Sequence, residues 1–273
     1  MSLRINAALK QGFSRTFETN GLLLVGVFVV FGLLDAVVSQ TLLAGMSQQL
    51  GGAGAFGPGS APAGFQQGQM SPFGGQQSPL ALDGIPFAVA GALSLLFGLV
   101  AEGLRIVSIR VFASDNVQSI PGSLAKRNIL LAVLNGVVAG IIVGIAVAVG
   151  VVLLVFPGIF LALSFFFVRQ EIAVEDKNFA DALSGSWALS KGNRIELFGL
   201  ALIIWIIGII ASSPNIVLFF LSPDVAAIVG QVINGFVVVF GIATATRAYE
   251  QLRSERSAGI DDAVGSTEFD DSL

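Results

Sequence analysis

The chain alternates between long apolar runs and short polar segments. Six runs rich in Leu, Val, Ile, Ala, Phe and Gly are long enough to cross a bilayer core of about 30 Å, which needs roughly 20 helical residues. The six predicted spans are Gly21–Ala44, Ile85–Ala101 with a charged extension to Phe112, Ile129–Phe156, Ile159–Val174, Ile195–Ala211 and Val225–Ala248. A helix satisfies its backbone hydrogen bonds internally, whereas an open strand edge in lipid cannot. The pattern therefore predicts an all-α integral membrane protein with six transmembrane helices.

The composition excludes a soluble globular domain and most catalytic chemistry. Hydrophobic residues make up 54% of the 273 residues and charged residues 12%, about half the charged share of ordinary soluble domains. The chain has no cysteine and no histidine, so disulfides, thiolate metal sites and the commonest general base are absent. No Walker loop, nucleophile elbow or metal-spaced acidic cluster occurs. The sequence predicts no catalytic residues, no cofactor site and no metal site.

The basic residues predict how the chain is oriented. All 14 Lys and Arg residues fall on one side of the six predicted spans, and such an excess marks the cytoplasmic side. Both termini are therefore expected in the cytoplasm, with the protein in the cell membrane. A cleaved signal peptide is the alternative interpretation of the first span. Its basic lead of about twenty residues would be long for a signal, and no small-residue cleavage site follows Leu43.

Polar segments divide the chain into regions. Residues 1–19 are expected to form a cytoplasmic amphipathic helix, and residues 20–249 the membrane domain. Within it, residues 44–84 are rich in Gly, Gln and Pro and carry one charge, Asp83, which predicts a disordered external loop. Residues 250–273 are polar and end acidic, which predicts a disordered cytoplasmic tail. The acidic exposed segments and the excess of Arg over Lys indicate a halophilic source.

Three amphipathic stretches precede the first, third and fifth spans. Their apolar residues recur every three or four positions: Ile5, Leu9, Phe13 and Phe17 in the first stretch, Ile120 and Leu124 in the weaker middle one, Val117–Arg127, and Phe179, Leu183 and Trp187 in the third. Each is expected to lie in the cytoplasmic membrane interface with its apolar face toward lipid, and each is followed by an Asn (Asn20, Asn128, Asn193). The chain is therefore expected to contain three parallel repeats of an interfacial helix plus a membrane hairpin.

Small and polar residues within the spans indicate where helices pack. Gly136, Gly140 and Gly144 recur every four residues in the third span, so they share one helix face. Small residues at this spacing let bilayer helices approach closely; a gap for a ligand is the alternative interpretation. Isolated polar residues such as Asn135 and Ser164 are expected to form hydrogen bonds between helices.

Charged residues within spans are candidate functional groups, because burying a charge in hydrocarbon is expensive. Asp35 lies inside the first span with no Lys or Arg on the outer side to pair with it. It is expected either to meet water at the outer interface or to be protonated inside the bundle. Glu102 and Arg105 lie three residues apart in the second span and can pair on one helix face. A coupling network or ion path is the functional interpretation of these charges, and interface anchoring the structural one.

The segment from Pro157 to Asn193 carries the most specific local pattern. It combines a Pro157-Gly158 break, an acidic Glu175-Asp176 turn, a helix with Ser186-Trp187, and a Lys191-Gly192-Asn193 exit into the next span. This pattern resembles a group of prokaryotic multi-pass membrane proteins of unknown function, which includes the membrane domain fused to some glycerophosphoryl diester phosphodiesterases and the YciC-type inner-membrane proteins. The resemblance does not include the catalytic domain, so it implies an architecture and no activity. The acidic tail indicates similarity to a haloarchaeal member.

These observations favour a non-catalytic membrane module that binds lipid or a partner protein. Three interfacial helices on one leaflet would contact the cytoplasmic membrane surface. The expected partners are membrane lipids and a membrane protein or a second copy of the chain, and no nucleic acid. The alternative is a permease for a small apolar or lipid-like substrate, motivated by the helix bundle and Asp35. A membrane-embedded lipid enzyme is the least supported function, because general acid–base candidates are few.

Overall fold

The computed structural model describes residues 3–52, 82, 84–114, 121–212 and 223–268. Within these residues every regular element is a helix and no strand occurs. Six helices are long and apolar enough to cross a membrane: Thr19–Met46, Phe87–Ala113, Ile129–Leu153, Val155–Glu175, Arg194–Ala211 and Ile228–Ala258. The prediction of an all-helical membrane fold with six such helices is confirmed.

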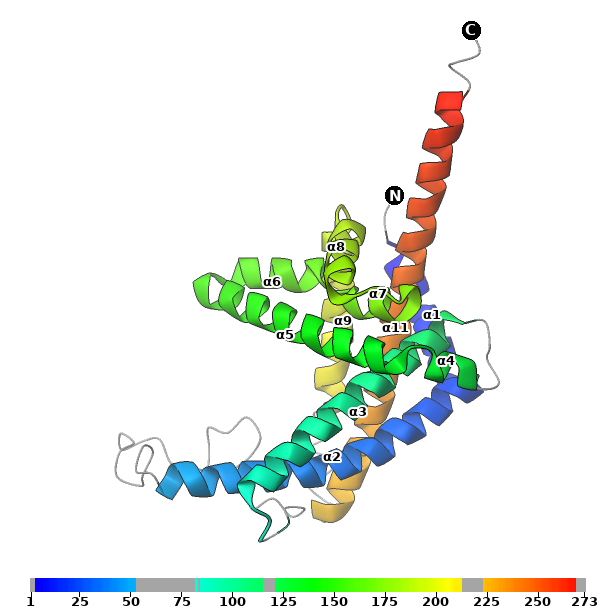
Figure 1. Cartoon of the computed structure of the whole chain (residues 1–273). Coiled ribbons are helices and arrows are strands. Elements are labelled where there is room, and N and C mark those ends of the chain that lie inside the picture. Colours follow the sequence, from blue (N-terminus) through cyan, green and yellow to red (C-terminus); the bar gives the residue numbers. More distant parts are fainter. Residues whose placement is uncertain (1–2, 53–81, 83, 115–120, 213–222, 269–273) are drawn as a thin grey trace.

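The helices follow one another in three similar groups (Figure 1). Their bounds are α1 Ile5–Phe17, α2 Thr19–Gly52, α3 Phe87–Ala113, α4 Gly122–Lys126, α5 Ile129–Leu153, α6 Val155–Ser164, α7 Val168–Glu175, α8 Phe179–Ser190, α9 Arg194–Ser212 and α11 Pro223–Glu268. A short helix (α1, α4 or α8) precedes each pair of membrane-length segments, which are α2 with α3, α5 with α6–α7, and α9 with α11. This order agrees with the expected repeat. Asn128 and Asn193 directly precede α5 and α9, whereas Asn20 lies in the first turn of α2.

The α5–α6 hairpin diverges from the α2–α3 pair, whereas α2 stays in contact with the first part of α11, where Nε2 of Gln231 donates to the carbonyl of Gly32 at 3.1 Å. Figure 1 shows the α5–α6 hairpin and the α2–α3 pair extending away from the region in which α3 packs on both α7 and α11. Buried side chains gather in this region, among them Ile106 and Phe112 of α3, Ile172 of α7 and Tyr249 of α11. At the far end of the α5–α6 hairpin, in contrast, side chains such as Phe156 are almost fully exposed. The core therefore lies where the helices converge.

Helix α1 packs against α11 through small residues. Its buried positions are Ala8, Gly12 and Thr16, one helical turn apart. A Cβ at Gly12 would lie 2.1 Å from Oγ1 of Thr244 on α11, so the two backbones approach very closely. The predicted apolar stripe is divided: its N-terminal half packs on the core, whereas its C-terminal half, including Phe13, is exposed.

The turn between α5 and α6 comes earlier than the Pro157-Gly158 break predicted. The chain turns at the extended residue Leu154, and Pro157 lies in the first turn of α6, where a missing N–H costs no helical hydrogen bond. The predicted spans Ile129–Phe156 and Ile159–Val174 are wrong at this boundary. A Cβ at Gly158 would lie 2.3 Å from Cγ2 of Val151, so Gly158 allows the two helices to touch beside the turn.

The predicted tail and external loop coincide only partly with helix ends. Helix α11 continues through Glu250 to Glu268, because Leu252 belongs to the buried core and Arg253 forms an ion pair with Glu175. The first part of the predicted loop 44–84 belongs to α2, which ends at Gly52. Residues 53–81 and 83 lie outside the described residues.

Candidate functional site

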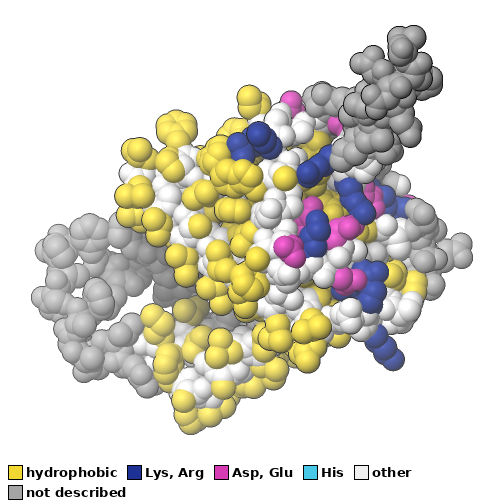
Figure 2. Space-filling view, turned by 45° about the horizontal axis from the view of Figure 1, so that its top comes forward, with side chains coloured by type: hydrophobic (Ala, Val, Ile, Leu, Met, Phe, Trp, Pro, Cys, Tyr) yellow, Lys and Arg dark blue, Asp and Glu magenta, His cyan; other side chains and the backbone are white. Residues whose placement is uncertain are grey.

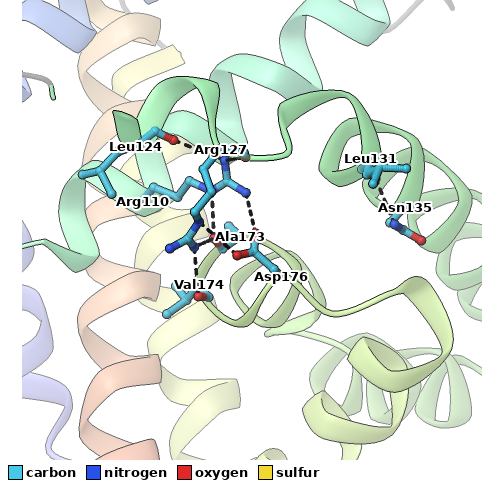
Figure 3. Close-up of polar contacts among 8 residues, drawn as sticks. All are labelled: Arg110, Leu124, Arg127, Leu131, Asn135, Ala173, Val174 and Asp176. Carbon is cyan, nitrogen blue, oxygen red and sulfur yellow. Dashed lines mark hydrogen bonds and ion pairs between the residues drawn. The ribbon is translucent and has the colours of Figure 1, made fainter. Parts of the chain in front are cut away.

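A buried arginine joins three helices where the pairs converge. The side chain of Arg110, near the end of α3, is 1% exposed. Its Nε donates to the carbonyl of Ala173 at 2.8 Å, and its Nη2 to Oδ1 of Asp176 at 2.9 Å. Its Nη1 donates to the carbonyls of Leu124 and Arg127. Figure 3 shows this side chain between the α4–α5 connection and the end of α7.

A second arginine completes this cluster, which we call the arginine clamp (Arg110, Arg127 and Asp176). Arg127 contacts Oδ2 of Asp176 through Nε at 2.9 Å, and its Nη2 donates to the carbonyls of Ala173 and Val174. These carbonyls end α7, where a helix has no internal donors for them, and cations are favoured there. Asp176 adopts the left-handed conformation that ends the helix, with φ 54°. The clamp therefore caps α7 and fixes it to α3 and α5.

Glu102 forms the centre of a second ionic group, at the middle of the molecule. Its side chain is 5% exposed, and its Oε1 accepts from Nε of Arg169 on α7 at 2.8 Å. Its Oε2 lies 3.5 Å from Nη1 of Arg105. The predicted Glu102–Arg105 pair is therefore present, but the shorter contact is made by Arg169. The two arginine side chains are 47% and 44% exposed.

The glycines of α5 make room for this ionic group. A Cβ at Gly136 would lie 2.7 Å from Oε1 of Glu102, and one at Gly140 would lie 3.3 Å from Nη2 of Arg169. Gly144, one turn further, has nothing within 4 Å of that position. All three line a cavity of about 300 Å³ that Arg169 also borders, which we call the glycine cavity. Gly136 thus serves close packing, whereas Gly144 borders open space.

Arg169 also borders a second cavity, on its other side. This cavity of about 390 Å³ lies between α3, α7, α9 and α11 and is lined by Arg105, Ile109, Phe166, Arg169, Gln170, Ala201, Ile204, Trp205, Gly241, Ile242 and Ala245. We call it the two-arginine cavity. Its charged lining residues are Arg105 and Arg169, and most of its other walls are apolar. Gln170 is 5% exposed, and its Oε1 has no hydrogen-bond partner.

The remaining predicted site residues lie elsewhere. Asp35 lies partly buried in α2, lines neither cavity, and has no ion pair in the part of the chain that the structure describes. Pro157 and Gly158 belong to the α5–α6 turn. Trp187 packs on Phe160 with ring centroids 5.6 Å apart, and the guanidinium of Arg194 lies over both rings. The structure therefore brings together the predicted residues of α3 and α5 and leaves the others apart.

The predicted hydrogen bond between helices is present for Asn135, whereas the hydroxyl of Ser164 donates within its own helix, to the carbonyl of Phe160 at 2.7 Å. Oδ1 of Asn135 on α5 accepts from the backbone N–H of Phe179 at 3.0 Å, at the start of α8. Its Nδ2 donates to the carbonyl of Leu131 in α5 itself (Figure 3). The hydroxyl of Ser186 donates to the carbonyl of Ser164 at 3.0 Å and accepts from the N–H of Phe167 at 3.1 Å. These bonds fix α8 against α5, α6 and α7.

The sequence patterns missed four residues of these groups. Arg110 and Arg127 were not candidates because neither lies near Asp176 in sequence; the acidic turn Glu175-Asp176 was the signal that a cation partner was needed. Arg169 was not paired with Glu102 because the two lie 67 residues apart. Gln170 follows it directly, and no sequence signal distinguishes this glutamine from a hydrogen-bonded one.

The chemistry that this arrangement offers is recognition of an anion. No group of acidic residues that could hold a metal occurs among the described residues. The two guanidinium charges at the cavity are opposed by one carboxylate, Glu102, so the group carries one net positive charge. The planar guanidinium group can donate two parallel hydrogen bonds to the oxygens of a phosphate or carboxylate. Together with the apolar walls, it suits an anion that also has an apolar part.

The family model of a domain of unknown function, DUF7847, matches residues 3–252. No curated protein and no solved structure matches the chain. The matched segment extends from the residues before α1 to the buried part of α11, so it contains the arginine clamp and both cavities.

Proposed function

Because the chain belongs to the DUF7847 family, for which no function is known, we propose from its own geometry that it is a non-catalytic membrane protein that binds an anionic membrane lipid. The observation that carries this proposal is the two-arginine cavity, in which Arg105 and Arg169 lie against apolar walls contributed by four helices. Ligand sites in proteins share this composition: mostly apolar lining, with few polar groups that set the orientation.

The surroundings of the cavity favour a lipid over a small soluble anion. Trp205 lines the cavity and is also exposed, and Ile206 and Ile209 continue the exposed apolar surface of α9. An acyl chain can follow such a surface while the headgroup meets the arginines. Tryptophan is enriched where one end of a side chain meets apolar groups and the other meets polar ones. We therefore place the headgroup at Arg105 and Arg169 and the chains along α9.

The orientation of the chain is part of the same proposal. The charged side chains gather on one side of the molecule, and hydrophobic ones cover much of the rest of the visible face (Figure 2). Membrane proteins place such a basic end in the cytoplasm. We place both termini there and the protein in the cell membrane, so the bound lipid comes from the cytoplasmic leaflet. The partner is then a membrane lipid, and no nucleic acid is involved.

The experiment is native mass spectrometry of the protein purified gently from its own membranes. We expect the wild type to retain an anionic phospholipid, and the double variant Arg105→Gln/Arg169→Gln to lose it at least about tenfold. Arg4→Gln is the matched control, because Arg4 is exposed and lines neither cavity. Equal retention by the wild type and the double variant, or a folded wild type without lipid, would overturn the proposal.

A second candidate function is transport of an apolar or lipid-like substrate. The observation in its favour is that Arg169 and Phe166 line both the glycine cavity and the two-arginine cavity, so these two side chains stand between the two spaces. Flux measured in liposomes tests it: transport should fall in Arg169→Gln and remain unchanged in Asp35→Asn, whose side chain lines neither cavity. No flux in the wild type would eliminate this candidate.

The finer family relationships are also proposals. We propose similarity to the YciC-type group on the residues from Pro157 to Asn193, and a haloarchaeal source on the acid-rich exposed segments. A membrane protein partner or a second copy of the chain is a further proposed partner, for which the same mass spectra would give a defined additional mass.

A further inference from the structure

We infer, resting on the proposed function, that the two-arginine cavity selects a phosphodiester headgroup that carries a free hydroxyl group. Three observations support this selectivity: the net charge of the ionic group, the unused donors of the arginines, and the unpartnered amide of Gln170.

The charge of the ionic group matches a single negative charge. Glu102 contacts both Arg169, at 2.8 Å, and Arg105, at 3.5 Å, so two positive charges and one negative charge leave one net positive charge. A phosphodiester carries one negative charge at neutral pH, whereas a phosphomonoester carries about 1.5 to 2. A phosphomonoester would therefore leave excess negative charge beside the buried carboxylate of Glu102. A zwitterionic headgroup would bring an ammonium group toward two guanidinium groups.

The arginines retain donors for the phosphate oxygens. Arg169 uses its Nε on Glu102, and its two terminal nitrogens have no hydrogen-bond partner among the described residues. Arg105 makes only the longer contact through Nη1. Both side chains are about half exposed, so their terminal nitrogens can turn toward a ligand. Charge-assisted bonds from guanidinium to phosphate are frequently paired, which fixes the headgroup in one orientation.

Gln170 supplies the acceptor for the hydroxyl. It follows Arg169 on α7, lines the same cavity and is 5% exposed, yet its Oε1 has no partner. Buried side-chain oxygens in proteins are nearly always hydrogen-bonded, so an exception needs an explanation. This oxygen has almost no accessible surface, so rotation of the amide turns it toward the cavity that the residue lines. A hydroxyl group attached to the phosphate through a short linker would then donate to it while the arginines hold the phosphate. A headgroup without a hydroxyl would leave it unsatisfied.

The test compares lipids that differ in one group only. The full-length protein is incubated with equimolar phosphatidylglycerol, phosphatidylmethanol, phosphatidic acid and phosphatidylcholine with identical acyl chains, and the bound lipids are counted by native mass spectrometry. We expect phosphatidylglycerol to exceed phosphatidylmethanol, which lacks the hydroxyls, about fivefold or more. Phosphatidylmethanol should in turn exceed phosphatidic acid and phosphatidylcholine. Equal binding of phosphatidylglycerol and phosphatidylmethanol would overturn the role of the hydroxyl.

The variant Gln170→Leu isolates the amide. It should abolish the preference for phosphatidylglycerol over phosphatidylmethanol and leave the total amount of anionic lipid nearly unchanged. The matched control is Gln251→Leu, because Gln251 also has unpartnered amide atoms but does not line the cavity. If Gln251→Leu lost the preference as Gln170→Leu does, the effect would be structural and the inference would be wrong.

Two further arms separate the inference from the proposed function and the lipid from a free ligand. If the wild type bound no anionic lipid, the proposed function itself would be contradicted. If it bound anionic lipids without preferring those with a hydroxyl group, only this inference would be contradicted. Glycerophosphoglycerol, the water-soluble headgroup without acyl chains, should displace the lipid weakly, at least about a hundredfold less well than the lipid. Displacement at similar concentration would assign the site to a free phosphodiester, which overturns the lipid source.

Discussion

At the scale of single residues, the arginine clamp joins α7 to α3 and to the α4–α5 connection. Arg110 is a cation whose three nitrogens all donate to protein oxygens: three carbonyls and one carboxylate. Desolvating a guanidinium is costly, and only such complete pairing offsets it. The half-exposed Arg105 lies at the other extreme, because solvent screens its contact with Glu102.

Removing the Arg110 side chain should destabilise the fold strongly. In Arg110→Ala the carboxylate of Asp176 and the carbonyl of Ala173 each lose one partner and keep Arg127, so the cost is that of the lost charge-assisted hydrogen bonds, about 1.5–3 kcal/mol. Arg110→Lys should recover only part, because an ammonium group cannot reproduce the fork. Thermal unfolding in detergent measures both. Arg105→Ala is the control, expected to cost below about 1 kcal/mol; an equally large loss there would contradict this account.

The glycines of α5 should respond differently to the same substitution. Gly136→Ala places a methyl group 2.7 Å from Oε1 of Glu102, so the ion pair with Arg169 must shift, at a cost of about 1–3 kcal/mol. Gly144→Ala meets nothing within 4 Å and should stabilise the helix by up to about 1 kcal/mol. Thermal unfolding of the two variants compares them. If both melted alike, close packing at Gly136 would not be the cause.

At the scale of helices, small residues decide which face is buried. The buried residues of α1 are Ala8, Gly12 and Thr16, and not the large apolar residues whose spacing is most visible in the sequence. Close backbone approach brings many atoms into van der Waals contact, and this replaces the hydrophobic driving force that lipid does not supply.

Enlarging this face should detach α1 from α11. In Gly12→Leu the side chain would begin 2.1 Å from Oγ1 and 2.8 Å from Cα of Thr244, so backbone would have to move. Limited proteolysis should then cleave within α1 at a rate about tenfold or more above that of the wild type. Gly26→Leu is the control, because a Cβ at Gly26 meets nothing within 4 Å. Equal protection of Gly12→Leu would show that α1 is held by other contacts.

At the scale of the whole molecule, the apolar surfaces of the membrane-length helices need an apolar environment to cover them. Exposed large side chains occur along α2, α3, α5, α6, α9 and the first part of α11, among them Val152 and Phe156. A soluble monomer rarely exposes such continuous apolar surface. Bilayer lipid covers it, and the converging end keeps the charged side chains together (Figure 2).

Cysteine labelling tests the proposed orientation directly, because the chain contains no cysteine of its own. Single cysteines at the exposed positions Ser123 and Ser257 should resist a membrane-impermeant maleimide in intact cells and react after lysis. Leu82→Cys, exposed between α2 and α3, should react in intact cells. The reverse pattern would place the basic end outside and would also move the lipid to the other leaflet.

The sequence by itself determined the number of membrane-length helices, the all-helical class and the Glu102–Arg105 pair. Hydropathy acts along a segment, and a pair three residues apart depends only on helix geometry. These properties need no knowledge of how the helices cross. Local pattern was less reliable at boundaries: Pro157-Gly158 marks the start of α6 and not the turn, and α11 continues past Glu250 because Leu252 is buried.

Only the tertiary structure decided the sites. Arg169 contacts Glu102, which lies 67 residues away in sequence. Arg110 contacts Asp176, which lies 66 residues away. The two-arginine cavity and the unpartnered oxygen of Gln170 exist because four helices cross without filling the space between them. Such distances depend on crossing geometry, which small residues like Gly136 set through their contacts with other helices. The four-residue period of Gly136, Gly140 and Gly144 marks a packing face of α5, but it does not specify which residues of other helices meet that face.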